Sequence, residues 1–234
     1  MAIISTGDEL VSAEADPKLG QIRDLNTHTV SALVAQAGGI ACPIGIFKDE
    51  YELQLSAATN AMQDCDIIVF SAGSSVSNRD LTVKVFEKLG EPGILAHGIA
   101  IKPGKPTILG LAQKKPLIGL PGNPVSALVC ALVFLYPALK CLLGIPSDEG
   151  TLTEQVRLAT SLAQNDHRQD YLRATLERTS DGVLWADPYE RQDSSMISLL
   201  SKAECLIFRP PNAPAAQVGD VVEVINFPTG LAAI

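Results

Sequence analysis

The chain has 234 residues, of which 47% are hydrophobic and 19% are charged, and it carries a formal net charge of −8 at neutral pH. This length can bury one good core or be divided into two domains, and the composition is that of a globular protein. Because no surplus of cations is available to neutralise phosphates, the composition argues against a protein whose main partner is nucleic acid. It leaves room for a small anionic ligand that is held by a few local cations.

The cysteines and the opening residues indicate the compartment. The sequence contains no Cys-x-x-Cys pattern and no histidine cluster beside a cysteine, so reduced thiols are expected rather than disulfides or zinc. The opening residues show no signal-peptide pattern, which predicts a cytoplasmic protein. The five cysteines are scattered among apolar neighbours: Cys42, Cys65, Cys130, Cys141 and Cys205.

Strands and helices alternate from the start of the chain. Ile3 and Ile4 predict a strand that leads into a polar turn with the adjacent carboxylates of Asp8 and Glu9. Asn26 is a good N-cap, and apolar residues at helical spacing follow it as far as the glycine at position 38. A plain glycine turn with solvated acids is the simpler interpretation of residues 5–10.

A second strand and helix follow. Residues 40–47 form an apolar run that predicts a strand, and the acidic residues after it resemble a capping box at the start of a helix that reaches about Gln63. Asp49 therefore lies just after a strand, as Glu9 does. As a bare N-cap, Asp49 needs no function.

The segment from Asp66 to Asp80 is the centre of the pattern. It begins with the apolar run 67–70, typical of a strand buried on both faces, and then changes to serine, glycine and asparagine before a helical spacing resumes. A polar loop at the carboxyl end of such a strand is where open α/β sheets bind ligands, and small residues let a ligand approach the backbone. An ordinary turn capped by Asp80 is an equally good interpretation of this stretch alone.

Residues 94–124 carry a second group of polar loops. After a strand predicted at 94–101, Lys102 and Lys105 are held in a short loop with two prolines and a glycine, so the pair could clamp an anion or form a solvated turn. Short strands are predicted at 107–111 and 116–120. In the turn after them, Asn123 suits an N-cap and Pro124 the first position of a helix.

The run from Val125 to Leu139 has no charged residue, yet it is shorter than the ~20 residues of a membrane span and is interrupted by Pro137. It predicts a helix buried in the core. Strand–helix alternation up to about residue 143 predicts a three-layer α/β/α domain over 1–145 with a mostly parallel sheet.

The pattern changes after a linker at 144–150. Residues 171–176 alternate in sidedness, Asp181 and Gly182 suit a hairpin turn, and short strands are predicted at 183–189, 205–208 and 221–225. Residues 194–203 are the one helix-like stretch. These features predict a separate small all-β barrel domain over 151–228.

Taken together, the loops resemble the molybdopterin molybdenumtransferase (MoeA) family, to which the carboxyl-terminal part of gephyrin belongs. A second match, at 171–173 and 192–196, resembles the family's small C-terminal β-barrel domain. The resemblance covers nearly the whole chain and implies that the family's N-terminal half is missing here. The motifs are Thr6-Gly7-Asp8-Glu9-Leu10, Gly20-Gln21-Ile22-Arg23-Asp24, the loop ending in Asp80, Lys102-Pro103-Gly104-Lys105-Pro106, and Leu120-Pro121-Gly122-Asn123-Pro124-Val125-Ser126.

The resemblance implies a chemistry. Family members bind adenylylated molybdopterin and molybdate, insert molybdenum into the dithiolene and release AMP, assisted by Mg²⁺, and they form homodimers. Glu9, Asp49 and Asp80 would be the catalytic acids and the metal ligands, since a hard cation needs carboxylate oxygens. The implied substrate-binding residues are Thr6, Gly7, Asp8, Ser71, Gly73, Ser74, Ser75, Lys102, Lys105, Pro121, Gly122, Asn123 and Ser126.

Two positions in the central loop depart from the family pattern. Ala72 and Ser77 stand where the family usually has glycine, and a serine at a positive φ costs of order 1 kcal/mol. A catalytically weakened molybdopterin-binding or scaffold module is therefore the alternative to an enzyme. A nucleotide-processing enzyme built on the same first domain is a third option, against which the match to the β-barrel domain argues.

Overall fold

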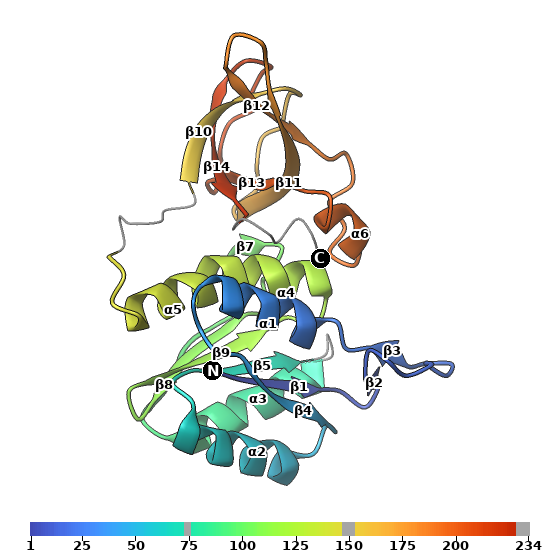
Figure 1. Ribbon diagram of the computed structural model, residues 1–234, viewed down its shortest axis with the longest axis vertical. Coiled ribbons are helices and arrows are strands. Elements are labelled where there is room, and N and C mark those ends of the chain that lie inside the picture. The colour runs from blue at the N-terminus through green and yellow to red at the C-terminus, as the bar shows by residue number, and fades with distance from the viewer. Residues whose placement is uncertain (73–75, 147–152, 228–234) are drawn as a thin grey trace. The chain divides into compact units, whose positions relative to one another are not determined.

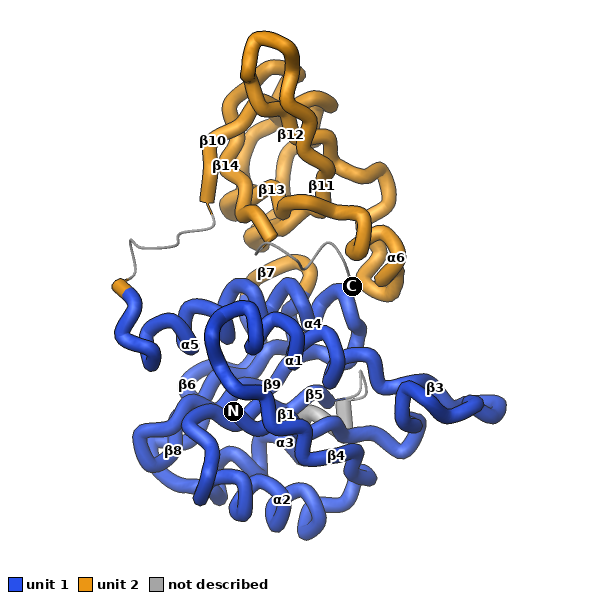
Figure 2. The backbone as a smooth tube through the Cα atoms, in the orientation of Figure 1, with its two compact units in different colours: residues 1–99, 104–145 blue, residues 100–103, 146–234 orange. Residues whose placement is uncertain are grey.

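The computed structural model describes residues 1–72, 76–146 and 153–227 (Figure 1). The chain divides into two compact units (Figure 2). The α/β unit comprises residues 1–99 and 104–145, and the barrel unit comprises residues 100–103 and 146–234. Residues 100–103 thus belong with the barrel, although the strand pattern had placed them in the first domain.

The α/β unit is built on a six-stranded sheet. The first four strands in the sheet order pair in parallel, and β8 pairs antiparallel with both β9 and β6, so that β8 alone of the six runs in the opposite direction, which confirms the predicted mostly parallel sheet. In sheet order the strands are β4 (Cys42–Phe47), β1 (Ala2–Thr6), β5 (Ile68–Ala72), β9 (Lys115–Leu120), β8 (Ile108–Ala112) and β6 (Pro92–His97).

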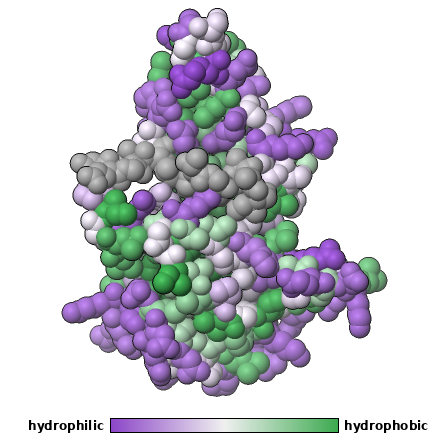
Figure 3. Space-filling model, viewed as in Figure 1, coloured by the Kyte–Doolittle hydropathy of each residue, from purple (hydrophilic) through white to green (hydrophobic). Residues whose placement is uncertain are grey.

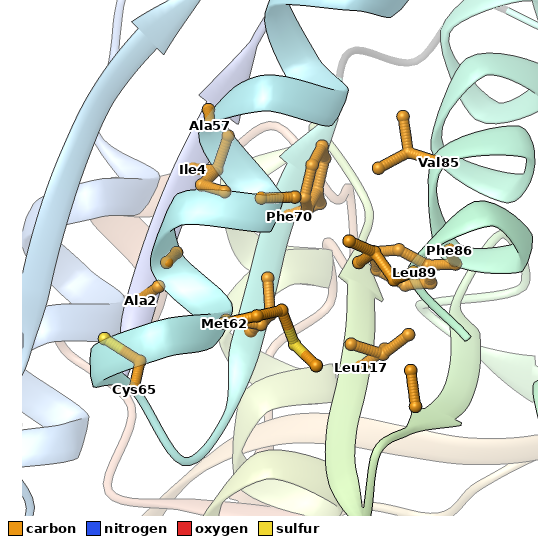
Figure 4. Packing of buried hydrophobic residues seen from close by; sticks show 14 of the residues in the cluster. Ala2, Ile4, Ala57, Met62, Cys65, Phe70, Val85, Phe86, Leu89 and Leu117 are labelled. Atoms are coloured by element: carbon orange, nitrogen blue, oxygen red, sulfur yellow. The ribbon is translucent and has the colours of Figure 1, made fainter. Parts of the chain in front are cut away.

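Helices cover both faces of this sheet (Figure 1). On one face lie α2 (Tyr51–Asp64) and α3 (Val76–Leu89), and on the other lie α1 (Asn26–Gln36), α4 (Pro124–Cys130) and α5 (Tyr136–Leu142). Under α2 and α3, the rings of Phe70 and Phe86 meet edge to face with centroids 5.3 Å apart, surrounded by Met62, Leu89 and Leu117 (Figure 4). This apolar layer holds the sheet and the two helices in place.

The long apolar helix is irregular at its centre. The residues between α4 and α5, Ala131–Leu135, form a π-helical turn (η1) just before Pro137, whose nitrogen cannot donate the regular backbone hydrogen bond. Pro124–Leu142 is long and apolar enough to cross a membrane, with a mean hydropathy of 2.1, but 56% of its apolar 18-residue stretch is buried inside the protein. The helix contacts α1 and the sheet, as expected for a core helix.

Five strands of the barrel unit form a closed ring, which confirms the predicted β-barrel. In order they are β12 (Leu184–Pro188), β10 (Thr153–Leu158), β14 (Val221–Asn226), β13 (Cys205–Arg209) and β11 (Gln169–Arg178), and β11 pairs again with β12. The short β7 (Ile101–Lys102) adds to β11 in parallel, and α6 (Ile197–Leu200) is a single turn within the helix expected at 194–203. β10 was not predicted, because only Val156 and Leu158 of its six residues are buried.

The edge strand β4 exposes apolar side chains. Ile44 and Ile46 are 38% and 37% exposed, and Ile40, just before the strand, is 80% exposed. Hydrophobic residues accordingly reach the visible surface of the α/β unit (Figure 3). An unpaired apolar edge is a surface on which another chain can pair.

Candidate functional site

A cavity lies at the carboxyl ends of β1, β5 and β9. Its volume is about 480 Å³, within the range of small-molecule sites. The position agrees with the rule that open α/β sheets bind ligands beyond the carboxyl ends of their strands. The cavity is lined by Glu9, Leu10, Pro17, Gln21, Ile22, Arg23, Asp24, Leu25, Asn26, Ser71, Ala72, Gly122, Asn123 and Pro124.

A small parallel ribbon forms one wall. Its strands are β2 (Leu10–Val11) and β3 (Ile22–Arg23), and the pairing is completed by a bond from the Ile22 N–H to the Glu9 carbonyl (2.8 Å). The sequence pattern places Leu10 in a polar turn and assigns residues 22–23 to no element, because two-residue strands carry no periodic pattern. The ribbon brings the first two polar motifs of the chain together at the cavity.

The start of α1 differs from the prediction. Asn26 is the first residue of the helix and does not cap it; the Asp24 carboxylate does, accepting from the Thr27 N–H (3.1 Å) and the Thr27 hydroxyl (2.6 Å). A capping side chain must come from just before the first turn, and Asp24 has that position. The positive end of the α1 dipole is therefore already matched by a carboxylate.

Asn26 has a different task. Its side-chain amide donates to the Ser71 hydroxyl at the end of β5 (2.8 Å) and to the Gly122 carbonyl in the turn before α4 (2.9 Å). Asn26 and Ser71 are both buried. One amide thus joins three segments of the cavity wall.

The acids predicted after β1 and β4 lie in neighbouring turns. The Gly7 N–H donates to the Phe47 carbonyl (3.0 Å), and the Asp49 N–H donates to a carboxylate oxygen of Asp8 (3.4 Å). Gly7 has φ +152°, and a side chain there would come within 2.8 Å of the Glu9 carboxylate. Of these acids, Glu9 lines the cavity. The glycine leaves space for the Glu9 side chain.

The third predicted acid is on a different element. Asp80 is exposed in α3, and the predicted loop residues Gly73, Ser74 and Ser75 lie outside the described residues. Within residues 1–72, 76–146 and 153–227, no three histidine, cysteine or acidic side chains are grouped so as to hold a metal ion. The site of three acids therefore stays a prediction.

The two predicted lysines belong to different compact units. Lys102 pairs in register with Asp170 between β7 and β11, and its ammonium lies 3.6 Å from the Asp170 carboxylate. Lys105 belongs to the α/β unit, where its carbonyl accepts from the Ile99 N–H (2.9 Å). Lys102 therefore has an internal counter-charge.

The other predicted binding residues lie at or near the strand ends. Gly122 and Asn123 line the cavity, while Pro121 and Ser126 are buried beside them. Asn123 has the predicted N-cap position of α4 and Pro124 is in its first turn, but the asparagine side chain makes no capping bond. Thr6 is buried at the end of β1, and its hydroxyl finds no hydrogen-bond partner among the described residues.

Comparison with known proteins identifies the fold and family. A family model described as "Probable molybdopterin binding domain" matches residues 2–141, and the model of the MoeA C-terminal region (domain IV) matches residues 155–227. The chain belongs to this molybdopterin-binding family. With both matches in one chain, it is a MoeA-like protein.

Individual relatives agree with this assignment. The molybdopterin molybdenumtransferases of Haemophilus influenzae and Bacillus subtilis are 30% and 28% identical to the MoeA-like chain, over 97% and 96% of its length. A crystal structure of a MoeA protein from Pyrococcus horikoshii matches 96% of the chain with 32% identity and a TM-score of 0.80. The chain spans about half the length of these proteins, namely 56%, 52% and 53%.

The domain IV barrel of the MoeA-like chain contains a buried cation. Arg173 is 1% exposed, and its guanidinium donates to the Gln192 side chain (3.2 Å) and to the carbonyls of Arg191 (3.3 Å) and Met196 (3.4 Å). Burial lowers the pKa of Arg173, because the charged form loses hydration. The arginine holds the loop before α6 against the barrel.

The sequence patterns assign no role to Asp24, Arg173 or Gln192, and they assign Asn26 only the role of an N-cap. Asp24 and Asn26 organise the cavity, and Arg173 and Gln192 organise the barrel loop. A signal was present for Asp24, Arg173 and Gln192, because each lies in a motif that carried the family resemblance. Which side chain would contact which segment depended on the tertiary fold.

Proposed function

We propose that the MoeA-like chain acts in molybdenum cofactor biosynthesis, inserting molybdenum from molybdate into adenylylated molybdopterin with release of AMP. One observation carries the proposal. The domain that matches the molybdopterin-binding family has a cavity of about 480 Å³ at the carboxyl ends of its strands, and Glu9, Ser71 and the Gly122–Pro124 turn line it. The names of the relatives from H. influenzae and B. subtilis support the reaction.

Each group has a proposed task. The Ser71 hydroxyl, the Gly122–Asn123 backbone and the buried Thr6 would face the pterin or its phosphate, with the loop residues Gly73, Ser74 and Ser75 beside them. Lys105 would balance the charge of phosphate and molybdate, because both substrates are anions. Lys102 is proposed for the same task and would have to exchange its ion pair with Asp170 for the substrate. Release of AMP then leaves molybdopterin with molybdenum bound to its dithiolene sulfurs.

Mg²⁺ is the proposed divalent cation. The described residues form no closed cage for it, and a cage is not required, since Mg²⁺ keeps several waters and binds through one or two carboxylates together with substrate phosphates. Glu9 is the acid best placed to contribute, because it lines the cavity. Asp49 and Asp80 are proposed as further ligands. When bound, the cation would neutralise phosphate charge.

The weakened binding or scaffold module remains the second candidate, and one observation favours it. Ala72, which stands where the family usually has glycine, lines the cavity. The strain expected at position 77 is absent, because Ser77 lies in the first turn of α3, where φ is negative.

Calorimetric titration separates the candidates. An enzyme should bind adenylylated molybdopterin more tightly with Mg²⁺ than without it, and should release AMP when molybdate is added. Asp80→Asn should remove most of the Mg²⁺ dependence. A module without turnover would bind molybdopterin and release no AMP. If neither pterin binds, the proposed function is wrong.

The substitution Ala72→Gly tests the altered loop. If the methyl group impairs the pocket, this variant should bind molybdopterin up to about tenfold more tightly, the equivalent of ~1.4 kcal/mol. Ser77→Gly is the matched control and should not tighten binding, because a serine with helical backbone angles has no backbone strain to be relieved. Equal affinities for Ala72→Gly and the parent would indicate that the loop already accommodates the ligand.

A homodimer and a cytoplasmic location complete the proposal. The exposed apolar residues along β4 support self-association of the chain. Light scattering at micromolar concentration should give the mass of a dimer, and Ile44→Lys should shift it towards the monomer. No membrane or nucleic-acid partner is proposed.

A further inference from the structure

We propose that Asn26 is a positioning residue, which holds Ser71 as a hydrogen-bond donor towards the ligand and fixes the Gly122 turn on the opposite wall. The inference rests on the proposed function for the nature of the ligand, molybdopterin. It rests on the structure alone for the role of Asn26. It goes beyond the sequence motifs, which assigned Asn26 only the role of an N-cap.

The first step is the direction of the bond to Ser71. An amide nitrogen can only donate, so in the 2.8 Å contact the Ser71 oxygen must accept. The hydroxyl proton of Ser71 is then directed elsewhere. Among the described residues no acceptor for it is found, and Ser71 lines the cavity. Asn26 thereby makes Ser71 a donor, which suits the phosphate or carbonyl oxygens of a pterin ligand.

The second step is the bond to the turn before α4. The other amide hydrogen of Asn26 points to the Gly122 carbonyl at 2.9 Å, so both donors of the side chain are used. Ser71 is 45 residues from Asn26 in sequence, and Gly122 is 96 residues away. The amide therefore sets the spacing of wall segments that no local structure connects.

The third step is the placement of Asn26 itself. It is 7% exposed at the first position of α1, which Asp24 anchors by capping. The Ser5 hydroxyl also meets the Thr27 hydroxyl at 2.9 Å, so the start of α1 is tied to β1 as well. A buried side chain on an anchored helix end has little freedom, which is the property that a positioning residue needs.

The decisive variant is Asn26→Asp, which keeps the shape and loses both donors. Its carboxylate would accept from Ser71, removing that proton from the ligand, and would repel the Gly122 carbonyl. We expect molybdopterin affinity to fall at least about tenfold, and to recover in part as the pH is lowered and the buried carboxyl takes up a proton. A purely structural role would show no such pH recovery relative to the parent.

A double-mutant cycle tests whether Asn26 acts through Ser71. If it does, Asn26→Ala combined with Ser71→Ala should lose less affinity than the sum of the two single losses. Additive losses would mean that Asn26 contacts the ligand independently, and the proposal would be overturned.

Asn165 offers a matched control in the barrel, because its amide also donates to backbone carbonyls, those of Arg168 (2.8 Å) and Pro210 (3.0 Å). Asn165→Asp should leave molybdopterin affinity within about twofold of the parent. An equal loss in both variants would show that any lost amide weakens binding through general destabilisation, which contradicts a specific role for Asn26.

Hydrogen exchange without ligand separates this proposal from the proposed function. Asn26→Asp should speed amide exchange both in the peptide that contains Ser71 and in the peptide that contains Gly122, while the α2 and barrel peptides keep parental rates. If the parent binds no molybdopterin but this pattern appears, the proposed function fails and the positioning role stands. Unchanged exchange at Ser71 and Gly122 would overturn the positioning role.

Discussion

The two units of the chain differ in what their interiors contain. Beneath α2 and α3, the α/β unit has a broad apolar layer, and its one described buried charge, Asp24, caps a helix. Among its described residues, the smaller barrel buries three charged side chains, Asp170, Arg173 and Arg209. A small barrel offers less apolar surface to bury, so buried hydrogen-bonded groups must fix its loops. We conclude that the first unit is stabilised mainly by apolar packing and the second in large part by polar networks.

The largest effect should come from the apolar layer. Phe70→Ala removes a fully buried ring that packs against Phe86, and should lower the free energy of unfolding of the α/β unit by about 3–5 kcal/mol. The loss in unfolding free energy is measured by urea unfolding that is monitored through hydrogen exchange in β5 and α3. Trp185, the single tryptophan, lies in β12 and reports on the barrel, whose transition should not change. A loss below about 1 kcal/mol would contradict the conclusion that the α/β unit is stabilised mainly by apolar packing.

The next effect tests the polar network. Arg173→Ala leaves the carbonyls of Arg191 and Met196 without their guanidinium donor and removes one of the two hydrogen bonds that Arg173 donates to the Gln192 side-chain oxygen. It should destabilise the barrel by about 2–3 kcal/mol, measured by Trp185 fluorescence in urea. Arg173→Met, which keeps most of the volume, should recover only the packing part. Full recovery with methionine would show that the arginine contributes bulk rather than hydrogen bonds.

The smallest effect concerns pH. Burial raises the pKa of Asp170, with Lys102 opposing the shift, so the folded chain holds this proton more tightly than the unfolded chain does. The stability of the parent barrel should therefore fall as the pH rises from the ordinary carboxyl range, about 3.9, through the raised pKa, and then level off. Asp170→Asn should lack this decrease, which Trp185 fluorescence can follow.

Asp166 provides a control of opposite sign for the pH experiment. Hydrogen bonds from Arg168 lower its pKa to about 2, so its contribution is present above the ordinary carboxyl pKa and is lost as the pH falls towards 2. Asp166→Asn should remove a decrease at the acidic end and weaken, without abolishing, the Asp170 effect, because burial is the largest cause of the raised pKa of Asp170 and repulsion from Asp166 only adds to it. If Asp170→Asn instead behaves like Asp166→Asn, Lys102 rather than burial dominates the environment of Asp170.

Local sequence patterns were enough to predict the class of each unit, and they include the motifs that carry the family resemblance. Apolar runs such as 67–70 and the alternation in 171–176 predict strands because side-chain periodicity follows directly from backbone geometry. Prolines and glycines marked the turns for the same local reason. These signals also predicted the mostly parallel sheet and the barrel, and the polar turn after the first strand, in which Glu9 lies.

The contacts between side chains, by contrast, depended on how the strands and helices pack. Asn26 is a residue type that commonly caps helices, but in the fold it is the first residue of α1 and donates to Ser71 and Gly122. The cap is formed by Asp24 instead. Lys102 likewise pairs with Asp170 in the barrel unit, whereas Lys105, only three residues later in the sequence, belongs to the α/β unit. Contacts between residues far apart in sequence depend on strand order and register, and a single sequence carries no local signal of either.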